Sequence, residues 1–286
     1  MKKILVTGGN GQLGQCFQKL ASDFPQFEFV FADSETLDIT DEVQVQDFLQ
    51  DFKPNFCINA AAYTAVDLAE NEKEKAFEIN AVAVSHLAKA CAEINSILIQ
   101  ISTDYVFDGE TNLCYDEEDF TNPQGIYGLS KRDGEILALE ENPKTVVIRT
   151  SWLYSEFNKN FMKTMLNLFP QKEEMNIVND QFGQPTNAND LAEAVMKIIT
   201  SEKLIPGIFH FSNYPETTWF HFAQKIADLS KSNIKLNPIT TAEFPTSAKR
   251  PVRSTMCLDK IEKTYNVELQ NWENSLENCI DNYLAK

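Results

Sequence analysis

The sequence has few or none of the features typical of several functional classes. Of its 286 residues only three are histidines, His86, His210 and His221, and their spacing does not suggest a metal site. No apolar run approaches the roughly 20 residues of a membrane-spanning helix. The apolar residues that follow Lys2 and Lys3 are too few for a signal peptide. We therefore expect a cytoplasmic protein with no membrane attachment and no bound metal.

Positive charge is also scarce. Lys and Arg total 25 against 42 Asp and Glu, which gives a formal net charge of -17. Nucleic acids and anionic membranes attract basic faces, so neither is an expected partner. A small anionic ligand would need cations placed locally. The six cysteines form no C-x-x-C pair, and we expect them to be reduced, buried thiols.

Apolar runs alternate with helical stretches through the first half of the chain. Strands are predicted over 3–7, 27–33, 55–62, 97–102 and 145–151, with helices near 11–22, 41–52, 72–95 and 126–141. This alternation predicts an α/β fold with a Rossmann-type parallel sheet wound on both faces.

Beyond Ser151 the alternation is looser. A helix at 188–202, a strand at 207–213, a helix at 217–229 and a proline-rich stretch at 237–256 are predicted. We expect residues 1–151 to form an NAD(P)-binding domain. We expect 152–286 to form mainly a smaller C-terminal substrate-binding cap, partly interleaved with the sheet, with about 175–202 returning to the first domain.

The stretch TGGNGQLG near the N-terminus allows two interpretations. Counted from Gly9 the glycines give G-x-G-x-x-G; counted from Gly8 they give Gly8, Gly11 and Gly14, a spacing that accompanies a different catalytic apparatus. In either case a strand, a tight turn and a helix place backbone N–H groups at a pyrophosphate. Asp33 follows Gly14 by 19 residues, where a carboxylate bonds the adenosine ribose and repels a 2′-phosphate. NADH is therefore favoured over NADPH, and both remain candidates.

The stretch YGLSK carries the candidate chemistry. Tyr127 and Lys131 are spaced i and i+4, so they share one face of the helix that begins there. A neighbouring cation lowers the pKa of a tyrosine, and we expect Lys131 to tune Tyr127 as the proton donor to a developing alkoxide. Thr103 ends the fourth strand, at the edge where doubly wound sheets bind ligands, and is expected to hold the carbonyl. This Tyr-x-x-x-Lys apparatus selects the glycine spacing that starts at Gly8.

With these motifs in order, the sequence resembles the extended short-chain dehydrogenase/reductases, and within them the dTDP-4-dehydrorhamnose reductase family. The matching stretches are TGGNGQLG, LDIT, NAAAYTAVDLAE, STDYVFDG, YGLSKRDGE, RTSWLY, NKNF, VNDQFGQPT and KRPVRS. The resemblance implies reduction of the C4 carbonyl of dTDP-6-deoxy-L-lyxo-4-hexulose to dTDP-L-rhamnose by NADH or NADPH. That reaction completes an activated sugar for surface polysaccharide.

The same resemblance implies two sets of site residues. The cofactor set is Gly8, Gly11, Gln12, Leu13, Gly14, Asp33, Asp38, Ile39, Ala62, Tyr63, Thr64, Tyr127 and Lys131. The substrate set is Thr103, Asp104 and Trp152. Guanidinium groups match phosphate oxygens in a fork, so Arg250 and Arg253 are added as candidates for the substrate's diphosphate.

Some questions stay open. Some family members dimerise through a magnesium site made of glutamates, but we interpret Glu273, Glu277 and Asp281 as a solvated helix face. No metal is therefore expected, and the protein could be a monomer or a homodimer. One alternative function is another nucleotide-sugar 4-ketoreductase. The other is a non-catalytic NAD(P)-binding regulatory subunit, which the intact Tyr-x-x-x-Lys pair disfavours.

Overall fold

The computed structural model describes residues 1–285. Its centre is a parallel sheet with the strand order β10-β5-β4-β3-β1-β2. The strands are β1 (Lys2–Thr7), β2 (Phe27–Ala32), β3 (Phe56–Asn59), β4 (Ile97–Thr103), β5 (Val146–Thr150) and β10 (Gly207–His210). The strand order reverses between β1 and β3, which is where doubly wound sheets bind their ligands. The predicted Rossmann-type α/β fold is confirmed, and the strand predicted over 207–213 is the sixth strand of this sheet.

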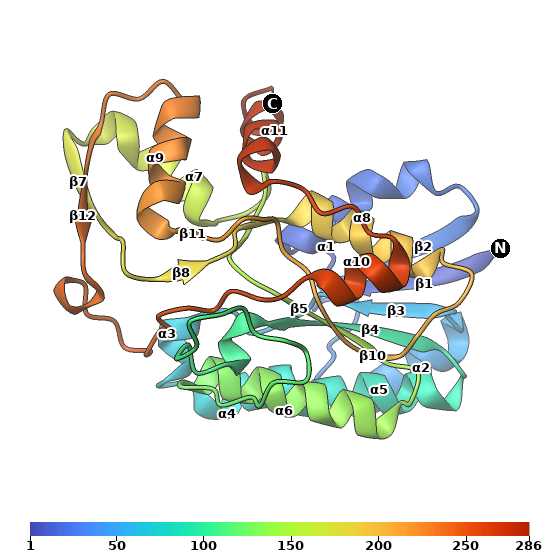
Figure 1. The fold of residues 1–286 in the computed structure, drawn as a ribbon. Helices are drawn as coiled ribbons and strands as arrows, with labels where there is room; N and C mark the ends of the chain where they lie inside the picture. Colours follow the sequence, from blue (N-terminus) through green and yellow to red (C-terminus); the bar gives the residue numbers. More distant parts are fainter. Residues whose placement is uncertain (286) are drawn as a thin grey trace.

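Helices cover both faces of the sheet (Figure 1). On one face lie α2 (Glu42–Phe52), α5 (Ala83–Glu93) and α6 (Ile126–Glu141); on the other lie α1 (Gln12–Leu20), α8 (Ala188–Ile199) and α10 (Asp259–Tyr265). Leu5 of β1 belongs to the apolar core beneath α2 and α5, whereas Ile4 and Val6 belong to the core beneath α1 and α8. Because the inner strands β1, β3, β4 and β5 are largely buried on both faces, most of their residues are apolar.

The helix predicted over 72–95 is interrupted. It consists of α4 (Lys73–Phe77), the π-helical turn η2 (Glu78–Val82) and α5, with the short helix α3 (Val66–Ala69) before it. Asn80, in the π-helical turn, accepts a hydrogen bond from Tyr63 N at 2.8 Å and donates to Ser130 Oγ at 3.1 Å. Gly134 lets α6 approach this turn, because a side chain there would overlap the Asn80 carbonyl. The interruption therefore fits α6 against its neighbour, and no local signal predicted it.

A second group of elements lies beyond the carboxyl ends of the sheet strands (Figure 1). It comprises α7 (Phe161–Leu168), α9 (Trp219–Leu229), α11 (Trp272–Leu284) and three small sheets: β6 (Leu153–Tyr154) with β9 (Thr186–Asn187), β7 (Glu174–Val178) with β12 (Lys235–Ile239), and β8 (Phe182–Gly183) with β11 (Thr217–Thr218). These helices have their own apolar core, centred on residues such as Phe222, Ile226 and Leu276. Between these segments the chain returns to the sheet as α8, β10 and α10.

One expectation about the cysteines is wrong. Cys114 and Cys257 form a disulfide, although 143 residues separate them. The backbone bridge between Tyr115 and Met256 aligns the two segments. No local pattern in the sequence predicts this bridge. The other four cysteines are buried, as expected.

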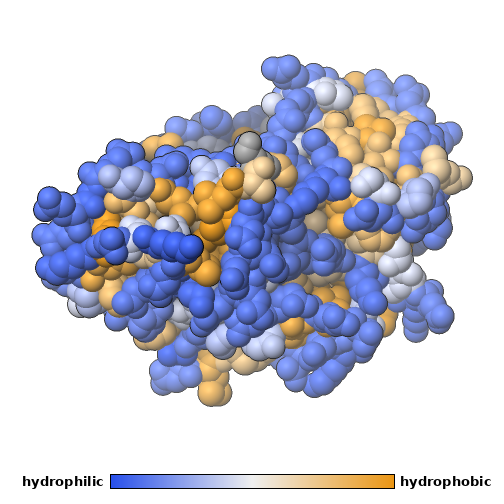
Figure 2. All heavy atoms as spheres, turned by 90° about the horizontal axis from the view of Figure 1, so that it is seen from above, coloured by the Kyte–Doolittle hydropathy of each residue, from blue (hydrophilic) through white to orange (hydrophobic). Residues whose placement is uncertain are grey.

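Hydrophilic residues predominate on the face shown in Figure 2, and hydrophobic residues gather there in separate areas. None of the helices within residues 1–285 combines the length and apolarity that crossing a bilayer requires.

Candidate active site

The glycine-rich turn joins β1 to α1. Gly8 has φ +66°, and a Cβ there would lie 2.7 Å from Ala61 N; a side chain at Gly14 would overlap the carbonyl oxygens of Gly8 and Gly9. These constraints match the spacing counted from Gly8. Gly11 caps α1, which has no side-chain cap and no acidic residue in its first turn. The helix N-terminus therefore offers backbone N–H groups and a positive dipole end to an anion.

A hollow of about 330 Å³ lies on one side of this turn. Of the predicted residues, it is lined by Gly8, Gly11, Asp33, Asp38, Ile39 and Ala62. Asp33 directly follows β2 and accepts hydrogen bonds from the Thr36 hydroxyl at 2.8 Å and from Asn10 Nδ2 at 2.6 Å. The Thr36 hydrogen bonds are the main cause of the lowered pKa of Asp33, so its carboxylate is ionised at neutral pH.

A larger cleft of about 530 Å³ opens on the other side, at the carboxyl ends of the strands. It shares Gly11 and Ala60–Ala62 with the first hollow, so the two adjoin, and together they are called the groove. The predicted residues that line this cleft are Gly11, Gln12, Leu13, Ala62, Thr64, Thr103, Asp104, Tyr127, Lys131 and Trp152. Residues from both halves of the chain thus meet at one place.

Tyr127, Thr103 and Lys131 lie together in the cleft wall. Tyr127 is the second residue of α6, and it lines the cleft together with Thr103 at the end of β4. Lys131 lies one turn further along α6, where it is buried and donates to the Ile101 carbonyl at 2.7 Å. The arrangement places a hydroxyl donor, a second hydroxyl and a buried cation along one wall, a set suited to protonating an oxyanion.

Burial sets the protonation states of this group. It raises the pKa of Tyr127 to about 12, opposed by the polar Thr103 side chain and supported by the charge of Asp104. Burial is thus the largest influence on this group, and the tuning of Tyr127 by the charge of Lys131 stays a prediction. Burial also lowers the pKa of Lys131 to about 8, opposed by the Glu135 carboxylate. At neutral pH the tyrosine is protonated and most of the lysine is charged.

Asp104 has an incomplete set of partners. Thr103 Oγ1 donates to its Oδ1 at 3.0 Å, while its Oδ2 is buried and has no hydrogen-bond partner within residues 1–285. Burial raises the pKa of this carboxyl to about 6, partly offset by the nearby hydroxyls of Ser254 and Thr103. A buried oxygen without a partner is costly, and a ligand hydroxyl in the cleft would satisfy it.

A buried charged network lies near Lys131, and the sequence analysis missed it. Arg149 donates to Glu135 Oε2 at 2.7 Å, and both side chains are almost wholly buried. Ser102 donates to the other carboxylate oxygen of Glu135. Glu135 is four residues after Lys131, so the Tyr-x-x-x-Lys spacing continues by one turn to a carboxylate; that spacing was the available signal.

A pair of indoles forms another part of the cleft lining. Trp152 has φ +47°, an uncommon backbone conformation for a bulky residue, and its ring stacks on Trp219 with 3.7 Å between centroids. Gly183 makes room behind it, since a Cβ there would lie 2.7 Å from Trp152 Cε2. Both indoles line the cleft. Trp219, at the start of α9, was not predicted, because its stacking depends on segments 67 residues apart.

Some predicted residues lie outside the groove lining. Arg250 donates to Asp67 Oδ2 at 2.7 Å, and Arg253 donates to Glu216 at 2.6 Å. Arg250 also interacts electrostatically with Tyr105, which does line the cleft. Two residues of the cofactor set, Gly14 and Tyr63, do not line it either.

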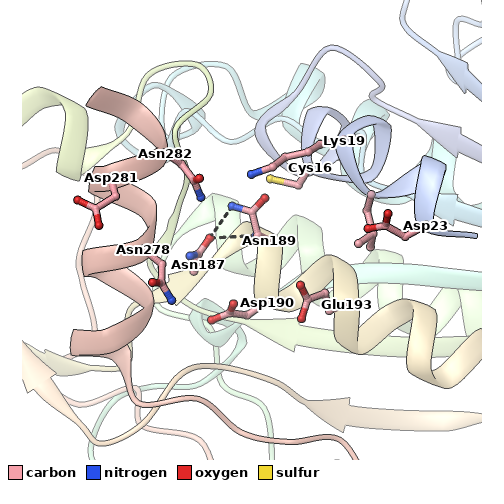
Figure 3. A pocket seen from close by; sticks show the side chains of 11 residues that line it. Cys16, Lys19, Asp23, Asn187, Asn189, Asp190, Glu193, Asn278, Asp281 and Asn282 are labelled. Atoms are coloured by element: carbon pink, nitrogen blue, oxygen red, sulfur yellow. Dashed lines mark hydrogen bonds between the residues drawn. The ribbon is translucent and has the colours of Figure 1, made fainter. Parts of the chain in front are cut away.

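A separate polar pocket of about 410 Å³ lies among α1, α8 and α11 (Figure 3). Lys19, Asp190, Glu193 and Asp281 line it, and Asn187 and Asn189, at the start of α8, are hydrogen-bonded to each other in its lining. It shares no lining residue with the cleft. Within residues 1–285 no group of three or more His, Cys, Asp or Glu side chains is arranged to hold a metal ion.

The doubly wound sheet, the glycine turn and the wall of Tyr127, Thr103 and Lys131 define a dinucleotide-dependent oxidoreductase of the short-chain type. The family model described as RmlD substrate binding domain matches residues 1–285. A curated dTDP-4-dehydrorhamnose reductase of Aggregatibacter actinomycetemcomitans is 41% identical over 97% of this chain and 98% of its own length. The chain belongs to the dTDP-4-dehydrorhamnose reductase family.

Solved structures agree with this assignment. A dTDP-4-dehydrorhamnose reductase of Clostridium acetobutylicum is 41% identical and superimposes with a TM-score of 0.95 over 99% of both chains. The enzyme of the same name from Bacillus anthracis, solved in complex with NADP, is 37% identical with a TM-score of 0.94 and covers 99% of this chain and 100% of its own.

Proposed function

We propose that this protein reduces the C4 carbonyl of dTDP-6-deoxy-L-lyxo-4-hexulose to give dTDP-L-rhamnose, with NADH or NADPH as the reductant. The observation that carries the proposal is the cleft in which Thr103, Tyr127 and Lys131 meet the glycine turn. The names of the relatives and the NADP complex of the Bacillus anthracis protein support it. In this proposal residues 1–151 hold the cofactor, and most of 152–286 holds the substrate.

The residues of the chain have distinct roles in the proposed reaction. The bound dihydronicotinamide supplies the hydride to C4. Tyr127 donates its proton to the C4 oxygen as negative charge develops there, and Thr103 hydrogen-bonds the same oxygen. The charge of Lys131 then stabilises the tyrosinate that remains, and this residue also bonds the nicotinamide ribose. The raised pKa of Tyr127 keeps its proton in place until the alkoxide forms.

The other groove residues are assigned to parts of the cofactor that their chemistry fits. The N-terminus of α1 takes the cofactor's diphosphate, Asp33 takes the adenosine ribose, and Asp38 and Ile39 flank the adenine. Gly14 fits α1 against the glycine turn. Ala62, Tyr63 and Thr64 follow β3 beside the middle of the cofactor; Tyr63 does so through its backbone.

On the substrate side, Asp104 Oδ2 accepts a sugar hydroxyl, and the indole of Trp152 packs against the sugar or the base. Arg250 and Arg253 reach the substrate's diphosphate by exchanging Asp67 and Glu216 for phosphate oxygens.

The test is oxidation of the reduced nicotinamide, followed by absorbance with purified protein. The substrate is dTDP-4-keto-6-deoxyglucose, given with and without a 3,5-epimerase and with each of NADH and NADPH. We expect oxidation only when the epimerase is present, with dTDP-L-rhamnose as the product. Oxidation without the epimerase would indicate a different 4-ketoreductase. Cofactor binding with no oxidation in any combination would indicate a non-catalytic subunit.

A further inference from the structure

The cleft has few cations for the anions that the proposed function brings to it. The protein carries a net charge of -17, whereas a dinucleotide and a nucleotide sugar each bring a diphosphate. Among residues 1–285, only two that line the cleft are positively charged, Lys131 and Lys159. Lys131 is buried and hydrogen-bonded to the Ile101 carbonyl, and the two candidate arginines are paired with carboxylates. Lys159 is therefore the lining cation that is available to a phosphate.

Its two neighbours in sequence fix the position of Lys159. Asn158 Nδ2 donates to the Asn10 carbonyl at 2.7 Å, and Asn160 Nδ2 donates to Gln12 Oε1 at 2.8 Å. Both acceptors belong to the glycine turn or to the first residue of α1. The segment 158–160 is thus attached on both sides of Lys159 to the element that offers its N–H groups to an anion.

The side chain of Lys159 has no competing partner. It is exposed, and within residues 1–285 it makes no ion pair or hydrogen bond. Lys163, one turn further on, differs in this respect: it donates to the Glu156 carbonyl at 3.2 Å and lies over the Tyr283 ring. Asn160 caps α7 and also lines the cleft, so a second helix N-terminus begins beside the lysine. The local field on this side of the cleft favours an anion.

We propose that Lys159 binds the diphosphate of the dinucleotide from the cap side, opposite the backbone N–H groups of α1. The inference rests on the proposed function and deepens it. In this proposal the segment 158–160 connects the bound diphosphate to the cap, so cofactor binding holds this part of the cap in place. The substrate carries the same diphosphate chemistry, so the experiment must separate the two sources.

The experiment compares three variants with the wild-type protein. Lys159→Gln removes the charge and retains much of the length, and Lys159→Arg restores the charge. Lys172→Gln makes the same charge change at an exposed cap residue that does not line the cleft. Dissociation constants are measured for NADH by fluorescence titration and for dTDP by calorimetry, at low and high salt. Thermal unfolding confirms that each variant is folded.

We expect Lys159→Gln to weaken NADH binding about two- to fivefold, since an exposed ion pair contributes up to about 1 kcal/mol. The loss should shrink in high salt, because screening already weakens this contact in the wild-type protein. Lys159→Arg and Lys172→Gln should bind NADH as the wild type does, and dTDP binding should be unchanged throughout.

Two results would overturn the inference. Weaker dTDP binding with unchanged NADH binding would assign Lys159 to the substrate's diphosphate instead. Unchanged binding of both ligands would leave Lys159 as a solvated lysine. Failure of the wild-type protein itself to bind NADH or NADPH would refute the proposed function, and that result is distinguishable because it does not depend on any variant.

Discussion

His210 makes the stability of this protein depend on pH in a way that can be calculated. It ends β10, is 0% exposed, and its Nε2 lies 3.4 Å from the Arg149 guanidinium. The ring also meets Phe107 edge-on, with 5.7 Å between centroids. Burial, and after it the charge of Arg149, lowers the pKa of His210 from 6.5 to about 3. The folded protein therefore holds a neutral imidazole at every pH above that value.

The direction of the effect follows from the two pKa values. Below pH 6.5 the unfolded chain binds a proton at this ring, whereas the folded protein does not until about pH 3. Stability is therefore lost as the pH falls through this window, by about 1.4 kcal/mol per pH unit once well below the upper value. Between pH 7.5 and pH 5 the loss is about 2 kcal/mol, a sizeable part of the roughly 5–15 kcal/mol that stabilises a typical protein.

Urea unfolding at pH 7.5 and pH 5 tests this calculation on the wild type and His210→Gln, with His221→Gln as the exposed control. Burial raises the pKa of Asp104, Glu117 and Asp190, which opposes the histidine effect, so the comparison between proteins is the decisive quantity. His210→Gln should lose about 2 kcal/mol less than the wild type over this interval, whatever its starting stability. Equal losses in His210→Gln and the wild type would refute the reasoning.

Three further predictions concern the active site. Tyr127→Phe should lower kcat by about 10²- to 10⁴-fold while leaving the Kd for NADH unchanged, as measured by steady-state kinetics and fluorescence titration; a weakened Kd would mean that the hydroxyl serves binding. Because the pKa of Lys131 is about 8, kcat should fall as the pH rises above that value, and in Lys131→Arg the fall should move to higher pH; a flat pH profile to pH 10 in the wild type would contradict the proposed role of the charge. Asp33→Ser removes a carboxylate from the hollow that is proposed to hold the ribose, so the ratio of kcat/KM for NADPH to that for NADH should rise about tenfold; an unchanged ratio would place the 2′-phosphate elsewhere.

The features predicted correctly are those with local signals. Each strand of the first half is a short apolar run ended by a turn, and such a run is visible without knowledge of its neighbours. The residues that line the groove follow because the carboxyl ends of parallel strands meet at one edge, which brings Gly11, Thr103 and Tyr127 to the same cleft.

The features that were missed depend on contacts between distant segments. The Cys114–Cys257 disulfide needs the bridge that aligns Tyr115 with Met256, and the indole wall needs α9 to meet Trp152. The pKa of Tyr127 depends on how deeply the cleft wall is buried, which no spacing reveals. The sequence indicated that the arginines of KRPVRS suit phosphate, but not that carboxylates already pair with them.

The most direct test of the proposed reaction is the fate of the hydride. NADPH or NADH deuterated at the transferable C4 position is supplied with dTDP-6-deoxy-L-lyxo-4-hexulose, and the product is analysed by NMR and mass spectrometry. The account predicts dTDP-L-rhamnose with one deuterium, located at C4 of the sugar, and almost none of this product with Tyr127→Phe. A product without deuterium, or with the label at another carbon, would contradict the assignment of this cleft to reduction of the C4 carbonyl.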